Sequence, residues 1–348
     1  MPYCHQIYNG LTIDSDARVR PCCHIDDTIG LEQVFIDEFD YTAETNFPKL
    51  AKVMETEWHD ACRPCIQEEN LGNISPRIYA NERYKNLPAG QYNIIDLKLS
   101  NTCNLSCVMC NSGASSTWHQ IVKQNPDLVE YNNELYPDSI DRDFEIKNNV
   151  LSIMDNIKFL KLSGGEPFLI KKVKKLCKDL IAKHGDVSNI DLQITTNGNV
   201  ILDDEWYNIL NKFNTDLNIS VDGLGSRYEY IRPGSSWKIL QEFIKCTKQK
   251  YTGKVNITVV AQALNYIQIP LIREWAKDNG FEYDISEILY HPFFLNNSSV
   301  NPKLRKKYGV PTIHEWNPDN FIKMQKYLER LDKIHGKDFK TECREFFE

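Results

Sequence analysis

The stretch Leu99–Gly113, LSNTCNLSCVMCNSG, places Cys103, Cys107 and Cys110 within eight residues, directly after an apolar segment with the character of a strand. Thiolates are the ligands that iron–sulfur clusters use. Three of them leave one iron of a four-iron cluster without a protein ligand, and such an open position can bind a substrate, as it does on catalytic zinc. The loop therefore predicts a metal centre in which one coordination position is open to a ligand.

Two other interpretations of the same cysteines compete with an iron–sulfur cluster. In the first, Cys62-x2-Cys65 pairs with Cys107-x2-Cys110 as a four-thiolate zinc site, which leaves Cys103 without a role. In the second, small apolar thiols are buried by chance in a core. The rest of the sequence has to decide between these three interpretations.

Length and composition restrict the class of protein. The chain has 348 residues, 41% of them hydrophobic, so it can bury the core of one large domain or two unequal ones. It has no apolar run long enough to span a membrane and no signal peptide, so we expect a soluble, cytoplasmic protein with no membrane partner. Eleven cysteines in a reducing compartment favour metal or redox chemistry over disulfides. The net charge of −7 argues against a nucleic-acid partner.

From Ile94 onward, strand-like and helix-like segments alternate, which is typical of an α/β protein with a parallel sheet. The strand candidates are Ile94–Leu99, Ile157–Ser163, Ile190–Thr196, Leu217–Val221, Val255–Ala261 and Phe281–Leu289. The helix candidates include Leu169–Lys183, a segment from Trp237 to Ile244, and Ile267–Asn279. Six such units predict a partial (β/α)6 barrel, in which chemistry takes place at the carboxyl ends of the strands.

Short polar motifs follow the predicted strands at that end. LSGGEP, residues 162–167, follows the second strand, TTNG, residues 195–198, the third, and ISVDG, residues 219–223, the fourth. Paired glycines allow close approach to a ligand, and Glu166 can accept hydrogen bonds from an ammonium group. Each motif alone is weak, but together with the cysteine loop they indicate one site.

With these residues, the segment from Ile94 to Leu289 resembles the radical S-adenosylmethionine (radical SAM) superfamily, whose most specific mark is the C-x3-C-x2-C loop. The resemblance implies a [4Fe–4S] cluster on the three loop cysteines and S-adenosylmethionine (SAM) on its open iron. It also implies that reductive cleavage of SAM yields a 5′-deoxyadenosyl radical, which takes hydrogen from a substrate carbon. The implied cofactor-binding residues are Gly164, Gly165, Glu166, Asn197, Ser220, Asp222, Arg232 and Asn265.

The residues before the barrel contain five further cysteines, four of which fit a second site. GLTIDSDARVRPCC, residues 10–23, predicts a hairpin, and FPKLAKVMETEWHDAC, residues 47–62, predicts a helix that Pro48 begins. Hairpin, helix and C-x2-C resemble the twitch module, a short form of the SPASM auxiliary-cluster domain. The resemblance implies a second [4Fe–4S] cluster on Cys4, Cys22, Cys62 and Cys65, with Cys23 as an alternative to Cys22 and zinc as an alternative to iron.

These interpretations give a domain organisation and a short list of further candidates. The expected parts are an auxiliary module at 1–83, a linker at 84–93, the barrel at 94–300 and a helical C-terminal extension at 301–348. Residues 124–149 are polar and read as an insertion with a helix near its end. Tyr290 and His291, which follow the sixth strand, are the candidates for acid–base catalysis.

The function expected from the resemblance is that of a radical SAM oxidoreductase or peptide-modifying enzyme. The substrate is expected to be a peptide, which is crosslinked, oxidised or epimerised, or a small metabolite, which is oxidised. An electron donor such as flavodoxin or ferredoxin is the expected partner. The alternative is a zinc-binding scaffold without catalysis.

Overall fold

Nine strands form one sheet in the computed structural model, which describes residues 2–26, 29–36, 38–70, 72–132, 135, 151, 153–286, 289 and 291–347. Their order is β3-β2-β1-β4-β5-β6-β7-β8-β9. The six consecutive strands from β4 onward are all parallel. They are β4 (Ile94–Leu97), β5 (Phe159–Leu162), β6 (Asp191–Thr196), β7 (Asn214–Ser220), β8 (Lys254–Val260) and β9 (Glu282–Ser286). The predicted α/β fold with six parallel barrel strands is confirmed.

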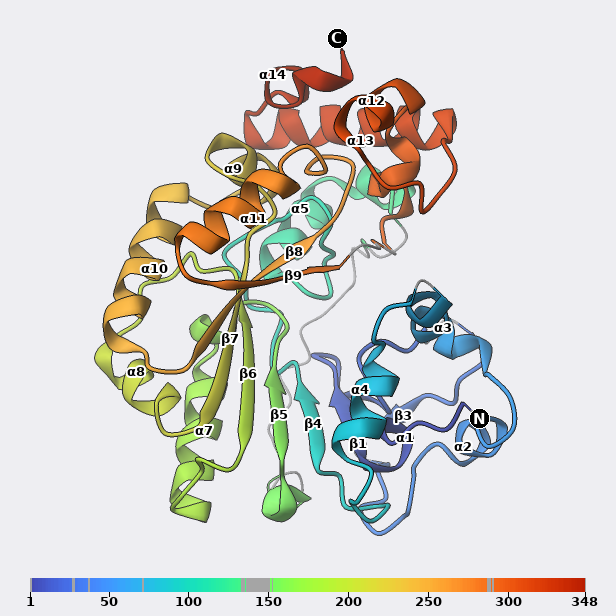
Figure 1. The fold of residues 1–348 in the computed structure, drawn as a ribbon, viewed down its shortest axis with the longest axis vertical. Coiled ribbons are helices and arrows are strands. Elements are labelled where there is room, and N and C mark those ends of the chain that lie inside the picture. Colours follow the sequence, from blue (N-terminus) through green and yellow to red (C-terminus); the bar gives the residue numbers. More distant parts are fainter. Residues whose placement is uncertain are drawn as a thin grey trace.

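Helices cover the convex face of this curved sheet (Figure 1). They are α7 (Lys171–His184), α8 (Asp204–Leu210), α10 (Trp237–Lys250) and α11 (Ile269–Asp278), whereas α5 (Ser116–Gln124) and α9 (Ser226–Ile231) lie beyond the carboxyl ends of the strands. Alternate strand residues such as Leu160, Leu192 and Ile194 are fully buried in one apolar core with Leu176 and Leu180 of α7. Burying a side chain of this size stabilises the fold by about 1.5–3 kcal/mol. The apolar core between the strands and the helices therefore stabilises the barrel.

The N-terminal residues continue the barrel sheet. Strand β1 (Gly10–Ile13) pairs in parallel with β4, β2 (Arg18–Arg20) pairs antiparallel with β1, and β3 (Val34–Phe35) forms the edge. The predicted hairpin is therefore confirmed. The sequence did not indicate that the hairpin pairs with the first barrel strand, because β1 and β4 lie some eighty residues apart in the chain.

Four short helices complete the N-terminal part: α1 (Gln6–Asn9), α2 (Pro48–Val53), α3 (Arg63–Asn70) and α4 (Pro76–Arg83). Pro48 begins α2 as predicted, but the helix ends at Val53 rather than continuing to residue 62. A separate 3-10 helix, Asp60–Cys62, follows because the His59 side chain accepts a hydrogen bond from the amide of Ala61 and caps it. Helix α4 packs Ala80 against the barrel.

The contact of α4 with the barrel lies at the amino ends of the first strands. Ala80 and Tyr84 pack against Ile94 of β4 and Phe159 of β5, and Arg83 forms an ion pair with Asp191 at the start of β6. The N-terminal part therefore contacts the barrel at the strand ends that lie opposite the motif loops.

The C-terminal residues form α12 (Pro302–Tyr308), α13 (Pro318–His335) and α14 (Phe339–Glu342), so the predicted helical tail is confirmed. Asn317 caps α13 by accepting from two amides of its first turn, and Gly336 ends it in the left-handed conformation. Figure 1 shows α13 above the carboxyl ends of the barrel strands. The helix expected near the end of residues 124–149 lies outside the described residues.

Candidate active site

The cysteine loop lies between β4 and α5, at the carboxyl end of the first barrel strand. Its backbone pairs with the segment after α9, because the amides of Ser106 and Val108 donate to the carbonyls of Pro233 and Ile231. The Trp118 indole donates to the carbonyl of Cys107 at 2.8 Å, and the Tyr327 hydroxyl of α13 donates to Val108 at 3.0 Å. The loop is thus fixed from both sides.

The thiols of Cys103, Cys107 and Cys110 gather on the inner side of this loop and are free of disulfides. Burial raises the pKa of all three thiols, to about 12 for Cys107. The pKa of Cys110 is raised further by the two other cysteines beside it. A bound metal deprotonates such thiols, since coordination outweighs the cost of burying a thiolate. Three neighbouring thiols, of which Cys107 is buried and the other two are half-buried, therefore fit a thiolate-ligated cluster.

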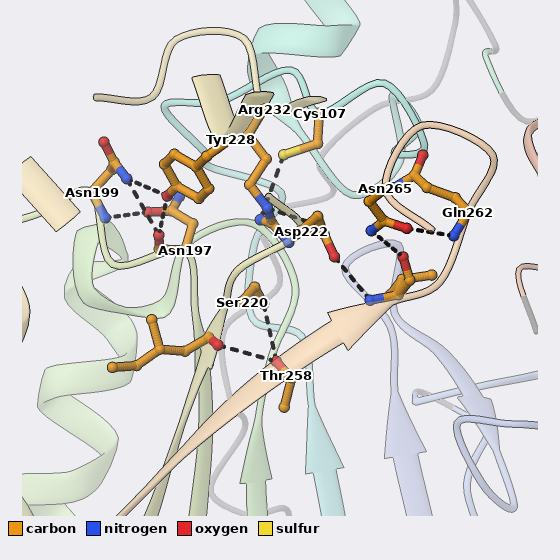
Figure 2. A network of polar contacts seen from close by, with 12 residues as sticks. Cys107, Asn197, Asn199, Ser220, Asp222, Tyr228, Arg232, Thr258, Gln262 and Asn265 are labelled. Atoms are coloured by element: carbon orange, nitrogen blue, oxygen red, sulfur yellow. Dashed lines mark hydrogen bonds and ion pairs between the residues drawn. The ribbon is translucent and has the colours of Figure 1, made fainter. Parts of the chain in front are cut away.

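Arg232 supplies positive charge to the same site (Figure 2). Its Nη1 lies 3.7 Å from the sulfur of Cys107, while Nε and Nη2 donate to Asp222 Oδ2 at 2.9 and 2.6 Å. The other oxygen of Asp222 accepts from the amide of Val260 at 2.8 Å. Both predicted cofactor residues, Asp222 and Arg232, are buried, and they tie the ends of β7 and β8 to the cysteine loop.

The glycine motif packs directly on the cysteine loop. Gly164 and Gly165 both have positive φ, and a Cβ on Gly165 would lie 2.3 Å from the carbonyl oxygen of Thr102. The amide of Glu166 donates to that same carbonyl at 2.8 Å. Only glycine allows this approach, so the motif fixes the distance between the first two strand ends.

The Glu166 side chain has a different environment from the one expected. The sequence predicts that it faces an ammonium group, but the carboxylate is fully buried and accepts from three protein donors. These are the amide of Phe168 at 3.2 Å, the hydroxyl of Thr196 at 2.8 Å and the amide of Asn197 at 2.8 Å. Burial raises its pKa to about 7 in spite of these donors. Glu166 therefore links the ends of β5 and β6, and ammonium binding remains a prediction.

Asn197 is the centre of a further network in Figure 2. Its Nδ2 donates to Asn104 Oδ1 at 2.9 Å and lies 3.9 Å from the sulfur of Cys103, and its carbonyl accepts from Tyr228 at 3.0 Å. Tyr228 also accepts from Asn199 at 2.6 Å. The sequence did not indicate Asn104, Asn199 or Tyr228 as site residues. For Asn199 one signal was available, since it directly follows the TTNG motif.

Ser220 and Asn265, the last two predicted cofactor residues, differ in whether their polar side-chain atoms can contact a ligand. Ser220, at the end of β7, is half-buried, and its hydroxyl lies 3.5 Å from that of Thr258. Asn265 is fully buried and holds its own loop, accepting from the amide of Gln262 at 2.8 Å and donating to the carbonyl of Val260 at 2.9 Å. Ser220 is therefore free to meet a ligand, whereas Asn265 shapes the loop.

The four cysteines expected to form the auxiliary site line one small pocket in the N-terminal part: Cys4, Cys22, Cys62 and Cys65. Burial raises the pKa of each, to about 12 for Cys4 and Cys62. Among the residues that the structure describes, no three His, Cys, Asp or Glu side chains surround a position for a single metal ion.

The alternative residue, Cys23, lies apart from this pocket. Its sulfur is 3.3 Å from the Nζ of Lys161 on β5, so it faces the barrel instead. The geometry therefore brings together the set with Cys22. Of the acid–base candidates, His291 is exposed in the loop after β9, and Tyr290 lies outside the described residues.

Residues 97–268 match the family model of the radical SAM superfamily. GTP 3′,8-cyclase 3 of Mycobacterium bovis and of Mycobacterium tuberculosis are each 26% identical over 246 residues, which cover 69% of this chain and 56% of those proteins. The chain thus spans about half the length of the curated relatives it matches. In the described part of the chain, no helix is long and apolar enough to cross a membrane.

Two solved structures are similar in part. SuiB of Streptococcus suis bound to its precursor peptide SuiA aligns with 97% of this chain and 71% of its own, at 13% identity and a TM-score of 0.42. TYW1 with a lysine–pyruvate adduct aligns with 66% of this chain and 70% of its own, at 16% identity and a TM-score of 0.32.

Proposed function

Because the chain belongs to the radical SAM superfamily, we propose that it holds two [4Fe–4S] clusters and uses SAM to crosslink, oxidise or epimerise a peptide or to oxidise a small metabolite. The observation that carries this proposal is the gathering of Cys103, Cys107 and Cys110 at the end of the first barrel strand. The three thiols would hold the catalytic cluster. When bound, the cluster and SAM supply a carbon-centred radical that removes hydrogen from a substrate.

The protein's own residues prepare this site. Arg232 places a buried positive charge beside Cys107, which favours the thiolate form of that ligand. The glycine motif and Asn197 fix the second and third strand ends around the loop. Helix α13 closes the outer side through Tyr327, which limits the access of water to the cysteines.

The auxiliary cluster is supported by the pocket that Cys4, Cys22, Cys62 and Cys65 line. Four thiolates would complete its coordination, so this cluster would bind no SAM. It would accept an electron from the substrate, or hold the N-terminal residues in place. A donor such as flavodoxin or ferredoxin would supply the electron for SAM cleavage.

Metal analysis of protein purified without oxygen tests the proposal. We expect about eight irons and eight acid-labile sulfides per chain, as two four-iron clusters require. A variant with Cys4 and Cys22 changed to Ala should retain about half of each, and Cys246→Ala, on the outer helix α10, should retain all. Stoichiometric zinc without sulfide would contradict the proposal and support the scaffold alternative.

A further inference from the structure

The concave face of the sheet is polar where the convex face is apolar. Along β5 and β6 the side chains alternate between half-buried and fully buried positions. On β5 to β8, the half-buried alternate positions include five polar side chains, Lys161, Gln193, Thr195, Ser220 and Thr258, with the apolar Phe159 and Val260 at the two ends. A barrel of this kind is normally filled by branched apolar side chains, so this face is suited to a polar molecule rather than to packing.

Charged side chains concentrate where this face meets the N-terminal strands. Lys161 lies 3.1 Å from Asp96 Oδ2, and both Lys98 and Arg20 lie 2.6 Å from the carboxylate of Asp14. Three cations thus share two carboxylates. Burial alone would raise the pKa of Asp96, but Lys161 and Lys98 lower it, so both lysines act on this ionised carboxylate.

The two lysines also keep unused donors. An ammonium group has three N–H donors. In the described part of the chain, Lys98 Nζ donates to Asp14 alone, and Lys161 Nζ contacts Asp96 and the sulfur of Cys23. Their side chains are 28% and 23% exposed, so a ligand on the concave face can reach both.

This cationic patch, Lys98 and Lys161, lies between the two groups of cysteines. The stem of Lys98 packs under the glycine motif, because a Cβ on Gly164 would lie 2.6 Å from Lys98 Cβ. Lys161 contacts Cys23, the neighbour in sequence of Cys22 in the auxiliary pocket. A molecule bound to both lysines is therefore close to the catalytic loop and to the auxiliary site.

We propose that Lys98 and Lys161 bind an anionic oxygen group of the substrate, a carboxylate or a phosphate, on the concave face. This inference rests on the proposed function for its reference to a substrate, while the anion site itself is a property of the fold. Ionised acceptors form charge-assisted hydrogen bonds with ammonium groups, which are stronger than neutral ones. The substrate is therefore an acid, and its anionic group fixes its position relative to the SAM site.

Alkylation of Cys23 in the cluster-loaded protein provides the test, with iodoacetate as the anionic probe and iodoacetamide as its neutral counterpart. The ratio of the two rates cancels the thiol's own reactivity. Cys246 on α10 serves as the reference within the same molecule, and mass spectrometry reads both sites. We expect iodoacetate to be favoured at Cys23 by about tenfold relative to Cys246, since a cationic site concentrates anions.

Changing Lys98 or Lys161 to Met should bring the ratio at Cys23 close to that at Cys246. Lys161→Arg, which keeps the charge, should preserve the preference, and so should Lys178→Met on the outer helix α7. Protection of Cys23 from iodoacetamide by succinate would identify a carboxylate site, and protection by inorganic phosphate a phosphate site.

Equal ratios at Cys23 and Cys246 in the parent protein would overturn the anion site, as would a preference that survives in the double Met variant. The readout does not depend on SAM cleavage. Loss of 5′-deoxyadenosine formation with an intact preference at Cys23 would therefore count against the proposed function and leave the anion site standing.

Discussion

Glu166 of the glycine motif was expected to bind an ammonium group, but in the structure it accepts hydrogen bonds from the protein itself. Its two oxygens accept from the amides of Phe168 and Asn197 and from the hydroxyl of Thr196, all in a fully buried position. A carboxylate accepts at both oxygens, whereas an amide side chain presents a donor on one side. The structure therefore gives Glu166 a structural role that the sequence motif alone did not reveal.

Glu166→Gln should lower the free energy of unfolding by about 1–3 kcal/mol, because the amide nitrogen would face a backbone or hydroxyl donor and leave it unpaired. Chemical denaturation measures this change. Glu274→Gln, an exposed position on α11, is the control and should leave the unfolding midpoint unchanged. Parent-like stability together with SAM affinity reduced tenfold to a hundredfold would instead support a direct bond to the ammonium group.

Arg232 and Asp222 form the buried ion pair of the site. Arg232→Met should lower the free energy of unfolding by about 3–5 kcal/mol, because it leaves the carboxylate of Asp222 buried without its partner. Thermal or chemical denaturation of the metal-free protein measures the loss, and adding Asp222→Asn should recover part of it. Arg330→Met, which breaks an exposed pair with Asp127, should cost much less. Equal losses of unfolding free energy in Arg232→Met and Arg330→Met would contradict the role of Arg232 as the partner of a buried carboxylate.

The strands and helices differ in how well the sequence predicted them. The six barrel strands were predicted to within about three residues, because apolar runs between motif loops mark buried parallel strands. The pairing of β1 with β4 was missed, because local periodicity carries no information on which distant strands pair. The end of α2 at Val53 was also missed, and the segment that the sequence assigned to one helix contains a separate 3-10 helix that His59 caps.

The site residues, like the strands and helices, were predicted from the sequence only in part. The cysteines expected to act together do lie together, since motif spacing and strand order place them at the same sheet edge or in the same pocket. The choice between Cys22 and Cys23 depended on which side of the chain each sulfur faces, and adjacent residues cannot be separated by spacing alone. The contribution of α13, through Tyr327, required the tertiary structure.

The N-terminal elements lead to a prediction about the auxiliary site. Changing Cys62 and Cys65 to Ala should remove about half of the iron and make residues 1–83 more sensitive to proteolysis, because a cluster there would link α3 to the rest of that part. The catalytic cluster should still form and cleave SAM slowly, since β4 and its loop are unchanged. Limited proteolysis and iron analysis measure both effects. Unchanged iron content in this variant would contradict the auxiliary cluster.

Taken as one structure, the protein joins two groups of cysteines to one sheet, with α4 in contact with the amino ends of the barrel strands and α13 in contact with the cysteine loop at their carboxyl ends. Strand β1 pairs in parallel with β4, so the hairpin that leads to Cys22 and the strand that leads to the cysteine loop belong to the same sheet.

The most direct test of this account is 5′-deoxyadenosine formation from SAM under reducing, oxygen-free conditions. The parent protein should form it, and the variant with Cys103, Cys107 and Cys110 changed to Ala should not, because those thiols would hold the only cluster with an open iron. Cys246→Ala should behave as the parent. Undiminished 5′-deoxyadenosine formation by the triple variant would contradict the assignment of the catalytic site.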